Sequence, residues 1–268
     1  MYKDSVAVTS FYSFLKIEDI FILQQKMLLA GKRKGVKGTI ILAPEGFNGS
    51  ISGSQEGVEY TLNQLVSLTQ ADDISIKTNY TNAHPFFRFK VKLKQEIVTL
   101  GAGPIDVNAL KGKYIEPQDW DAFIGRNDVV TVDVRNDYEI QCGTFRGAID
   151  PHTTTFRTFP AWVEANRDLF DGKKIAMCCT GGIRCEKSTA YMRKLGYEEV
   201  YHLHGGILQY LQDIDPAQTQ SKWEGECFVF DDRMCVDGEL APRCQMQIPR
   251  QRIADFSKPA VGSLRHAQ

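Results

Sequence analysis

The stretch KKIAMCCTGGIRCEKSTAYMRKLG, residues 173–196, contains the pattern that decides the fold. Its apolar start, KKIAMC, predicts a buried strand, whereas CEKSTAYMRKLG predicts a helix that ends at Gly196. The flanking sequence repeats this alternation: PQDWDAFIG and TFPAWVEANRDLF predict helices, and DVVTVDV and EEVYHLHGG predict strands. Such alternation is typical of a parallel sheet flanked by helices, so we expect an α/β domain over residues 117–218.

The connection between this strand and this helix is predicted to hold an anion. It runs from Cys179 to Arg184 through Thr180, Gly181, Gly182 and Ile183. Ligands of open α/β sheets bind at the carboxyl ends of the strands. The glycines let backbone N–H groups point to the centre of the loop, and the helix N-terminus adds positive potential there. A cysteine at the edge of such a cradle reacts as a thiolate, and Arg184 offers a planar set of donors to the anion or substrate.

Two adjacent cysteines leave two alternatives for the nucleophile. Four residues separate Cys179 from Arg184, which makes a small loop sized for a persulfide sulfur. Five residues separate Cys178 from Arg184, which is the spacing of cysteine-dependent phosphatases, but Met177 stands where that signature usually has histidine. Alternation along KKIAMC also directs Cys178 into a packed layer. We therefore predict that Cys179 is the nucleophile, and that Cys178 and Cys185 are core residues.

Residues 1–100 show a different order of elements. The sequence predicts a strand at 6–12, a helix at 17–30 that ends at Gly31, and a turn around residues 46–49 that contains the hairpin pair Asn48-Gly49. A second helix with Ser54 as its N-cap and further strands follow. The resulting order β-α-β-β-α-β is that of a ferredoxin-like α+β domain.

Two less regular segments complete the predicted organisation. Residues 101–117 are interpreted as a linker between the ferredoxin-like domain and the α/β domain. Residues 219–268 are expected to form a short C-terminal extension, with a small hairpin at CFVFDDRMCVDGEL.

Composition and charge narrow the classes of function. The 268 residues carry a formal net charge of −1, so binding to a nucleic acid would require a local basic surface. No stretch approaches the ~20 apolar residues of a membrane span, and MYKDSVAVTS lacks the pattern of a signal peptide. Seven cysteines without the spacing of a disulfide scaffold indicate a reducing compartment, so we expect a cytoplasmic protein with no membrane contact.

One dense basic cluster stands out in GKRKGVKG, residues 31–38. It has two interpretations. It is typical of a solvated helix end, where cations suit the C-terminal dipole, and it is also a candidate contact for phosphates. The cations of this cluster are Lys32, Arg33, Lys34 and Lys37.

The motifs of the second domain resemble the successive signatures of rhodanese domains. They are VTVDVRNDYEIQCGTFRGAI, CTGGIRCEKS and LHGGI. The resemblance implies that Cys179 is the catalytic cysteine, with Arg184 in its loop. It also implies that Asp133 and Arg135 support the loop from the neighbouring strand end.

The chain as a whole resembles a narrower family. GTIILAPEGFNGSISG, CTGGIRCEKSTAYM and CFVFDDR together are similar to the bacterial tRNA uridine hydroxylases, which join a ferredoxin-like unit to a rhodanese domain. This resemblance implies an enzyme that converts the wobble uridine of tRNA, position 34, to 5-hydroxyuridine. Molecular oxygen would be the co-substrate, with no bound cofactor, and tRNA the partner. The basic cluster Lys32, Arg33, Lys34 and Lys37 then becomes a candidate tRNA contact.

Two other functions fit the same loop. A sulfurtransferase would carry a persulfide on Cys179 to an acceptor, and a non-enzymatic module would only recognise an anion. The family commonly ends in CxxC pairs, whereas here Cys227, Cys235 and Cys244 offer too few ligands for a structural zinc site unless a histidine joins. We therefore predict no metal site.

Overall fold

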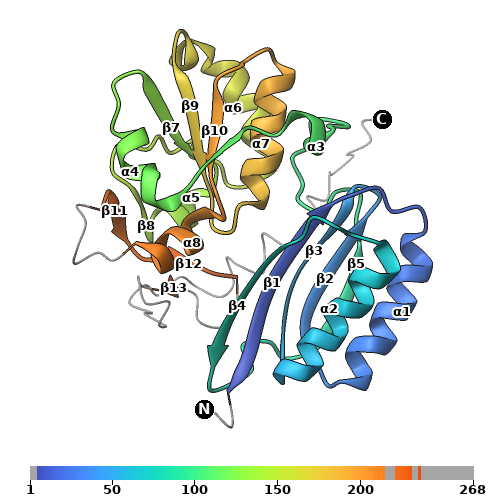
Figure 1. The fold of residues 1–268 in the computed structure, drawn as a ribbon. Helices are drawn as coiled ribbons and strands as arrows, with labels where there is room; N and C mark the ends of the chain where they lie inside the picture. Colours follow the sequence, from blue (N-terminus) through green and yellow to red (C-terminus); the bar gives the residue numbers. More distant parts are fainter. Residues whose placement is uncertain (1–4, 215–220, 231–234, 237–268) are drawn as a thin grey trace, which may run out of the picture.

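The computed structural model describes residues 5–214, 221–230 and 235–236, which form an N-terminal α+β unit and a parallel-sheet α/β unit (Figure 1). In the N-terminal unit five strands lie in the order β4-β1-β3-β2-β5. Helices α1 and α2 pack on one face of this sheet, where Phe11, Ile40 and Phe47 meet Met27 and Leu65. The strands are β1 (Val6–Phe14), β2 (Lys37–Ala43), β3 (Gly46–Gly53), β4 (Ser75–Thr81) and β5 (Phe89–Leu93), and the helices are α1 (Ile20–Arg33) and α2 (Gln55–Thr69).

The arrangement of this unit confirms the ferredoxin-like prediction. β1 pairs antiparallel with β3 and β4, and β2 pairs antiparallel with β3. β5 adds a parallel edge strand next to β2. Ser54 caps α2 as predicted, because its side chain accepts a hydrogen bond from the N–H of Gly57.

Two local predictions in this unit were wrong. Gly31 does not end α1 but lies inside it. Glycine is needed there because the ring of Phe89 packs against it, and an added Cβ would lie 2.2 Å from that ring. The hairpin turns at Pro44-Glu45, since Ala43 pairs with Gly46. Asn48 and Gly49 lie within β3, where Gly49 leaves room for the ring of Phe11.

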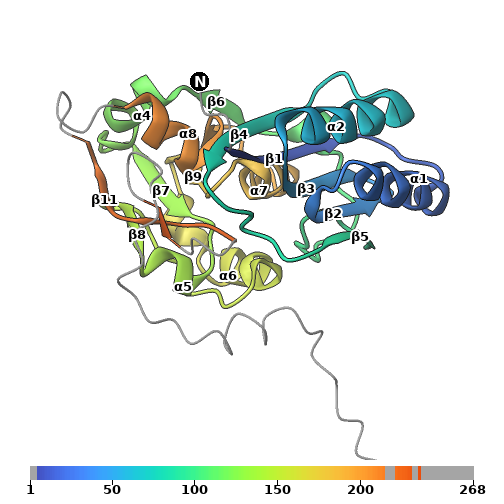
Figure 2. The same ribbon diagram turned by 90° about the horizontal axis from the view of Figure 1, so that it is seen from below.

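The second unit contains the predicted parallel sheet, with the strand order β6-β10-β9-β7. Apolar side chains on its two faces form separate cores with the flanking helices. α6 and α7 cover one face, and α4 and α8 cover the other (Figure 2). The strands are β6 (Lys113–Ile115), β7 (Val129–Asp133), β9 (Lys174–Cys178) and β10 (Val200–Leu203), and the helices are α4 (Pro117–Ile124), α6 (Phe159–Ala165), α7 (Ile183–Lys194) and α8 (Gly206–Asp213).

The interpretation of residues 101–117 as a linker was wrong for their second half. α3 (Val107–Leu110) lies there, and β6 is the edge strand of the parallel sheet. The predicted helix TFPAWVEANRDLF is also interrupted, because α6 ends at Ala165 and a 3₁₀ turn follows at Arg167–Phe170.

The described part of the C-terminal extension packs onto the α/β unit. Its first strand, β11 (Trp223–Gly225), pairs with β8 (Gly143–Phe145). The predicted hairpin forms between β12 (Cys227–Phe228) and β13 (Cys235–Val236). Cys227 and Val236 contribute to the core under α8. None of the helices in the described ranges combines the length and the apolar character that crossing a membrane requires.

The two units meet along α7. Lys187 of this helix is almost completely buried, and its ammonium group lies 2.7 Å from a carboxylate oxygen of Glu45 and 2.5 Å from one of Glu96. Ala190 packs beside it with Phe14 of the N-terminal unit. α7 is therefore enclosed by the parallel sheet on one side and by the N-terminal unit on the other (Figure 1).

Candidate functional site

The cysteine loop connects the end of β9 to the start of α7. The side chain of Cys179 is fully buried, and its Sγ accepts a hydrogen bond of 3.2 Å from the N–H of Gly182. Gly182 has a φ of +97°, and a Cβ there would lie 2.9 Å from the hydroxyl of Tyr12. Only glycine meets both conditions at this point, so the loop closes around the sulfur as the sequence predicts.

The loop lowers the pKa of the Cys179 thiol to about 6. Burial opposes ionisation, but it is outweighed by the thiol and N–H of Cys185, the guanidinium of Arg184 and the N–H of Gly182. Because pH 7 lies above this pKa, the thiolate is the favoured form at neutral pH. The site therefore presents a nucleophilic sulfur at neutral pH.

This ionisation can be measured by alkylation with iodoacetamide followed by peptide mapping. We expect the alkylation rate of Cys179 to rise with a midpoint at about pH 6 and to level off above it, because only the thiolate reacts. Cys142, whose pKa is raised by burial, should continue to gain rate above about pH 9. The midpoint is the readout, since burial slows the absolute rate. A midpoint for Cys179 near that of Cys142 would contradict an anion-stabilising loop.

Cys178 and Cys185 occupy apolar surroundings. Cys178 is the last residue of β9 and packs on the α8 side of the sheet, opposite to Cys179. Burial raises the pKa of both thiols well above their ordinary value. These positions agree with the prediction that both are core residues. They favour the loop in which the nucleophile is Cys179, four residues before Arg184.

Arg184 lies in the first turn of α7 and is held by a carboxylate that sequence reasoning missed. Its two terminal nitrogens donate to the carboxylate oxygens of Glu139 at 2.6 and 2.7 Å, and one also donates to the hydroxyl of Thr180. Both side chains are buried. The guanidinium therefore acts on the loop as a fixed charge, and its planar donor edge is engaged by Glu139. The capping box Asn136-x-x-Glu139 was the available sequence signal.

Asp133 and Arg135 support the loop indirectly, through the segment that carries Glu139. Their side chains are fully buried and paired at 2.6 Å, and Arg135 also donates to the backbone carbonyls of Glu139 and Gly143. Asp133 accepts a further bond of 2.8 Å from the hydroxyl of Thr144. The pair thus fixes the segment that carries Glu139, which in turn holds Arg184.

A turn at Gly205-Gly206 closes the loop from the side of α8. The N–H of Ile207 donates to the carbonyl of Cys179 at 2.9 Å. A Cβ on Gly206 would lie 2.6 Å from the same carbonyl oxygen, so this contact requires glycine. The late glycine pair of the sequence therefore serves close packing against the cysteine loop.

Two side chains of the N-terminal unit reach the loop, and no sequence pattern indicated either. The ammonium group of Lys77 on β4 donates to the carbonyl of Gly205. Burial lowers the pKa of Lys77 to about 8, although the negative charge of Cys179 acts to raise it. The ammonium group therefore remains mainly protonated at pH 7. The hydroxyl of Tyr12 donates to Glu186 at 2.8 Å. The thiolate site is therefore built by both units.

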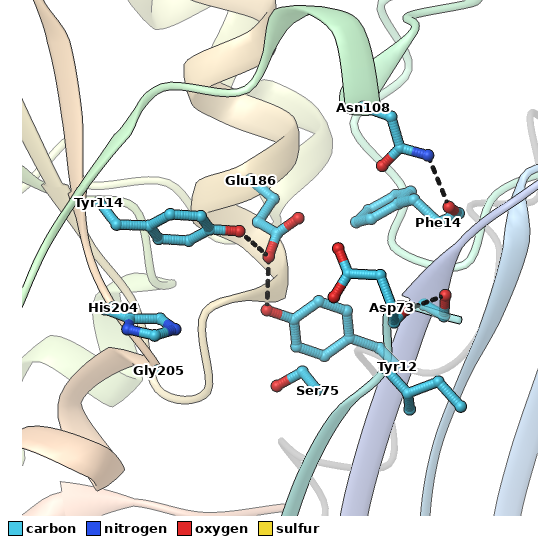
Figure 3. A pocket seen from close by; sticks show the side chains of 11 residues that line it. Tyr12, Phe14, Asp73, Ser75, Asn108, Tyr114, Glu186, His204 and Gly205 are labelled. Atoms are coloured by element: carbon cyan, nitrogen blue, oxygen red, sulfur yellow. Dashed lines mark hydrogen bonds between the residues drawn. The ribbon is translucent and has the colours of Figure 1, made fainter. Parts of the chain in front are cut away.

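A polar cavity of about 140 Å³ lies between the units beside Gly205. Figure 3 shows the hydroxyls of Tyr12 and Tyr114 pointing to the same carboxylate oxygen of Glu186, at 2.8 and 3.0 Å. His204 lies on the opposite wall from Asn108. A small polar substrate group could occupy this cavity next to the turn that covers Cys179.

The predicted basic cluster lies at the far end of the N-terminal unit. β1 runs toward the second unit and α1 runs back, so the end of α1 is remote from the cysteine loop (Figure 1). Lys34 is paired with Glu56 at 2.6 Å, whereas Lys32 and Arg33 are exposed. Lys37 is the first residue of β2. The structure does not bring these four cations to Cys179.

Within the described ranges, no group of three His, Cys, Asp or Glu residues is arranged to hold a metal ion. The thiols of Cys142 and Cys235 lie 3.2 Å apart, and Cys227 is buried nearby. Cys244 lies outside the described residues.

Comparison with known proteins agrees with this architecture. A family model described as the UPF0176 acylphosphatase like domain matches residues 6–97, and the rhodanese-like domain model matches residues 116–213. The chain is 55% identical over 243 residues to a protein of Rickettsia massiliae named tRNA uridine(34) hydroxylase. The aligned region covers 90% of this chain and 96% of the relative. A protein of the same name from Rickettsia bellii is 56% identical over the same length.

The fold and the cysteine loop define a rhodanese-type thiol protein that carries an acylphosphatase-like domain at its N-terminus. Within that class, the chain belongs to the tRNA uridine(34) hydroxylase family.

Proposed function

We propose that the chain hydroxylates the uridine at position 34 of tRNA to 5-hydroxyuridine, with Cys179 as the catalytic residue and molecular oxygen as co-substrate. One oxygen atom enters the base, and the other leaves as water with two electrons and two protons from a two-electron reductant. The family membership supports the reaction. The observation that supports the role of Cys179 is its thiol, whose pKa the loop lowers to about 6. A thiolate within this loop is a nucleophile at neutral pH and can bond to an electrophilic atom of the substrate.

The surrounding residues are proposed to hold this thiolate in place. Arg184 balances its negative charge from a fixed position set by Glu139. The loop residues Thr180, Gly181, Gly182 and Ile183 shape the cradle, and Asp133 and Arg135 brace Glu139. A uridine base must leave its stack to reach a buried sulfur, as enzymes that modify bases generally require. The cavity beside Gly205 offers polar partners for such a base.

The reaction can be tested on unmodified tRNA with the purified protein, oxygen and a two-electron reductant, and on tRNA from cells with and without the protein. We expect the uridine at position 34 to gain the mass of one oxygen atom. Isotopically labelled oxygen gas should place its label in the product, and exclusion of oxygen should stop the reaction. Mass spectrometry of the digested nucleosides is the measurement.

The same measurement separates the alternative function. A sulfurtransferase would replace an oxygen of its acceptor by sulfur and would need a sulfur donor rather than oxygen gas. A thiolated nucleoside that forms only with a donor would therefore contradict the hydroxylase assignment. No modified nucleoside at all, with tRNA still bound, would favour a binding module.

We also propose the cytoplasm as the site of action, because tRNA is the substrate.

A further inference from the structure

On the face of the N-terminal sheet opposite α1 and α2, α7 covers one end, where Phe14 and Ala43 pack with Ala190, whereas Ser10 farther along β1 is exposed (Figure 2). Phe11, Ile40 and Phe47 point to the two helices, and side chains alternate along a strand, so their neighbours point to the opposite side. The term open face is used for six residues on that side, one or two from each strand. They are Lys77, Ser10, Ser50, Thr39, Lys90 and Lys92.

Five of these residues form one row across the whole sheet. Ser10 lies opposite Lys77 in one direction and opposite Ser50 in the other. Thr39 lies opposite Ser50 and Lys90. Four strand spacings separate the two lysines, which makes the row roughly 19 Å wide. The row begins at Lys77, which contacts the Gly205 turn beside the cysteine loop, and it ends at the edge strand β5.

The sheet carries positive charge without negative charge. β1 to β5 contain no Asp or Glu, whereas Lys37, Lys77, Lys90 and Lys92 lie in them. In the part of the chain that the structure describes, Lys90 and Lys92 enter no ion pair within 4.0 Å. The pKa of Lys90 is lowered, mainly by the charge of Arg88 and also by burial and Lys92. Such a cluster of like charges favours a polyanionic partner.

The centre of the row indicates which part of a nucleic acid it fits. The hydroxyls of Ser10 and Ser50 lie 2.7 Å apart, and Ser10 is exposed. The six residues of the open face include no aromatic ring, and Tyr12, on the same side of β1, donates to Glu186 of α7. The row therefore offers hydroxyl and ammonium groups rather than rings for base stacking. Hydroxyl and ammonium groups bind phosphate oxygens and ribose hydroxyls, contacts that position RNA without reading its sequence.

We propose that the open face binds the sugar–phosphate backbone of the tRNA anticodon arm and positions the strand that leads to Cys179. This inference rests on the proposed function, because it takes tRNA as the substrate. Lys77 links the two parts of the site, since its ammonium group lies at the turn over the cysteine loop. The exposed cations Lys32 and Arg33 belong to α1, which packs on the other face of the sheet.

A matched pair of double variants tests this assignment. Lys90→Gln with Lys92→Gln removes two charges from the open face, and Lys32→Gln with Arg33→Gln removes two from the end of α1. Binding of an unmodified tRNA transcript is measured over a series of salt concentrations. The slope of log K against log salt should fall by roughly 1.4 to 1.8 for the first variant and stay unchanged for the second.

Activity provides an independent readout. For the Lys90/Lys92 variant we expect kcat/KM to fall several-fold while kcat at saturating tRNA is retained, since lost positioning contacts weaken binding of substrate and transition state alike. Thermal midpoint and the pH midpoint of Cys179 alkylation should match those of the unaltered protein.

The outcomes separate the two proposals. An unchanged salt slope in the Lys90/Lys92 variant, or an equal fall in the Lys32/Arg33 variant, would overturn the open face as the tRNA surface while leaving the reaction intact. If the unaltered protein binds tRNA but leaves the uridine unmodified, the proposed function fails and the open face stands.

Discussion

Replacing Cys179 with serine should abolish the modification of tRNA, with a fall in rate of about three orders of magnitude or more. A serine hydroxyl stays protonated at neutral pH, so the loop would hold no nucleophilic anion where the thiol has a pKa of about 6. The measurement is single-turnover formation of the modified nucleoside at saturating tRNA. Binding of tRNA should be unchanged, because the sulfur is buried and only its chemistry is removed.

Cys178→Ser is the matched control, since it makes the same change one residue away. Cys178 packs on the other side of the sheet, and burial raises the pKa of its thiol. We expect a stability loss of about 1 kcal/mol, from placing a hydroxyl in an apolar layer, with the modification rate retained. Retained activity in Cys179→Ser together with lost activity in Cys178→Ser would instead favour Cys178 as the nucleophile, with the phosphatase spacing to Arg184.

The second large effect is expected on stability, from Asp133→Asn. This change leaves the fully buried guanidinium of Arg135 without its carboxylate, and breaking a buried ion pair costs about 3–5 kcal/mol. The thermal midpoint of the α/β unit should fall by on the order of 10 °C. Circular dichroism or calorimetry at neutral pH measures it.

Asp128→Asn provides the comparison, because the pairs of Asp128 with Arg126 and Lys174 are partly exposed and solvent already screens them. Its thermal midpoint should stay close to that of the unaltered protein. Equal midpoints for the Asp133 and Asp128 variants would show that the buried pair contributes no more than a surface pair. The asparagine at position 133 should also slow modification, because Arg135 braces the segment that carries Glu139.

Local sequence patterns predicted most of the fold. The alternation of strands and helices indicated the parallel sheet, and Ser54 was identified as the N-cap of α2. The alternation in KKIAMC separated Cys178 from Cys179, because neighbouring residues of a strand face opposite sides. The glycine positions failed as turn signals at Gly31 and Gly49, since glycine also serves close packing against a ring.

Contacts between distant residues decided the rest of the site. By its charges, α7 would be taken for a surface helix at Glu186 and Lys187, yet both are buried between the two units. Lys77 is near Cys179 only because the units dock, and the open face emerges only from the register of five strands. Strand alternation, glycine spacing and helix start act over a few neighbouring residues, so sequence alone predicted the cysteine loop and favoured Cys179 over Cys178 as its nucleophile. Only the tertiary structure brought Glu139, Lys77 and Tyr12 to that loop, because burial and charge pairing depend on the packing of segments that are separated along the chain.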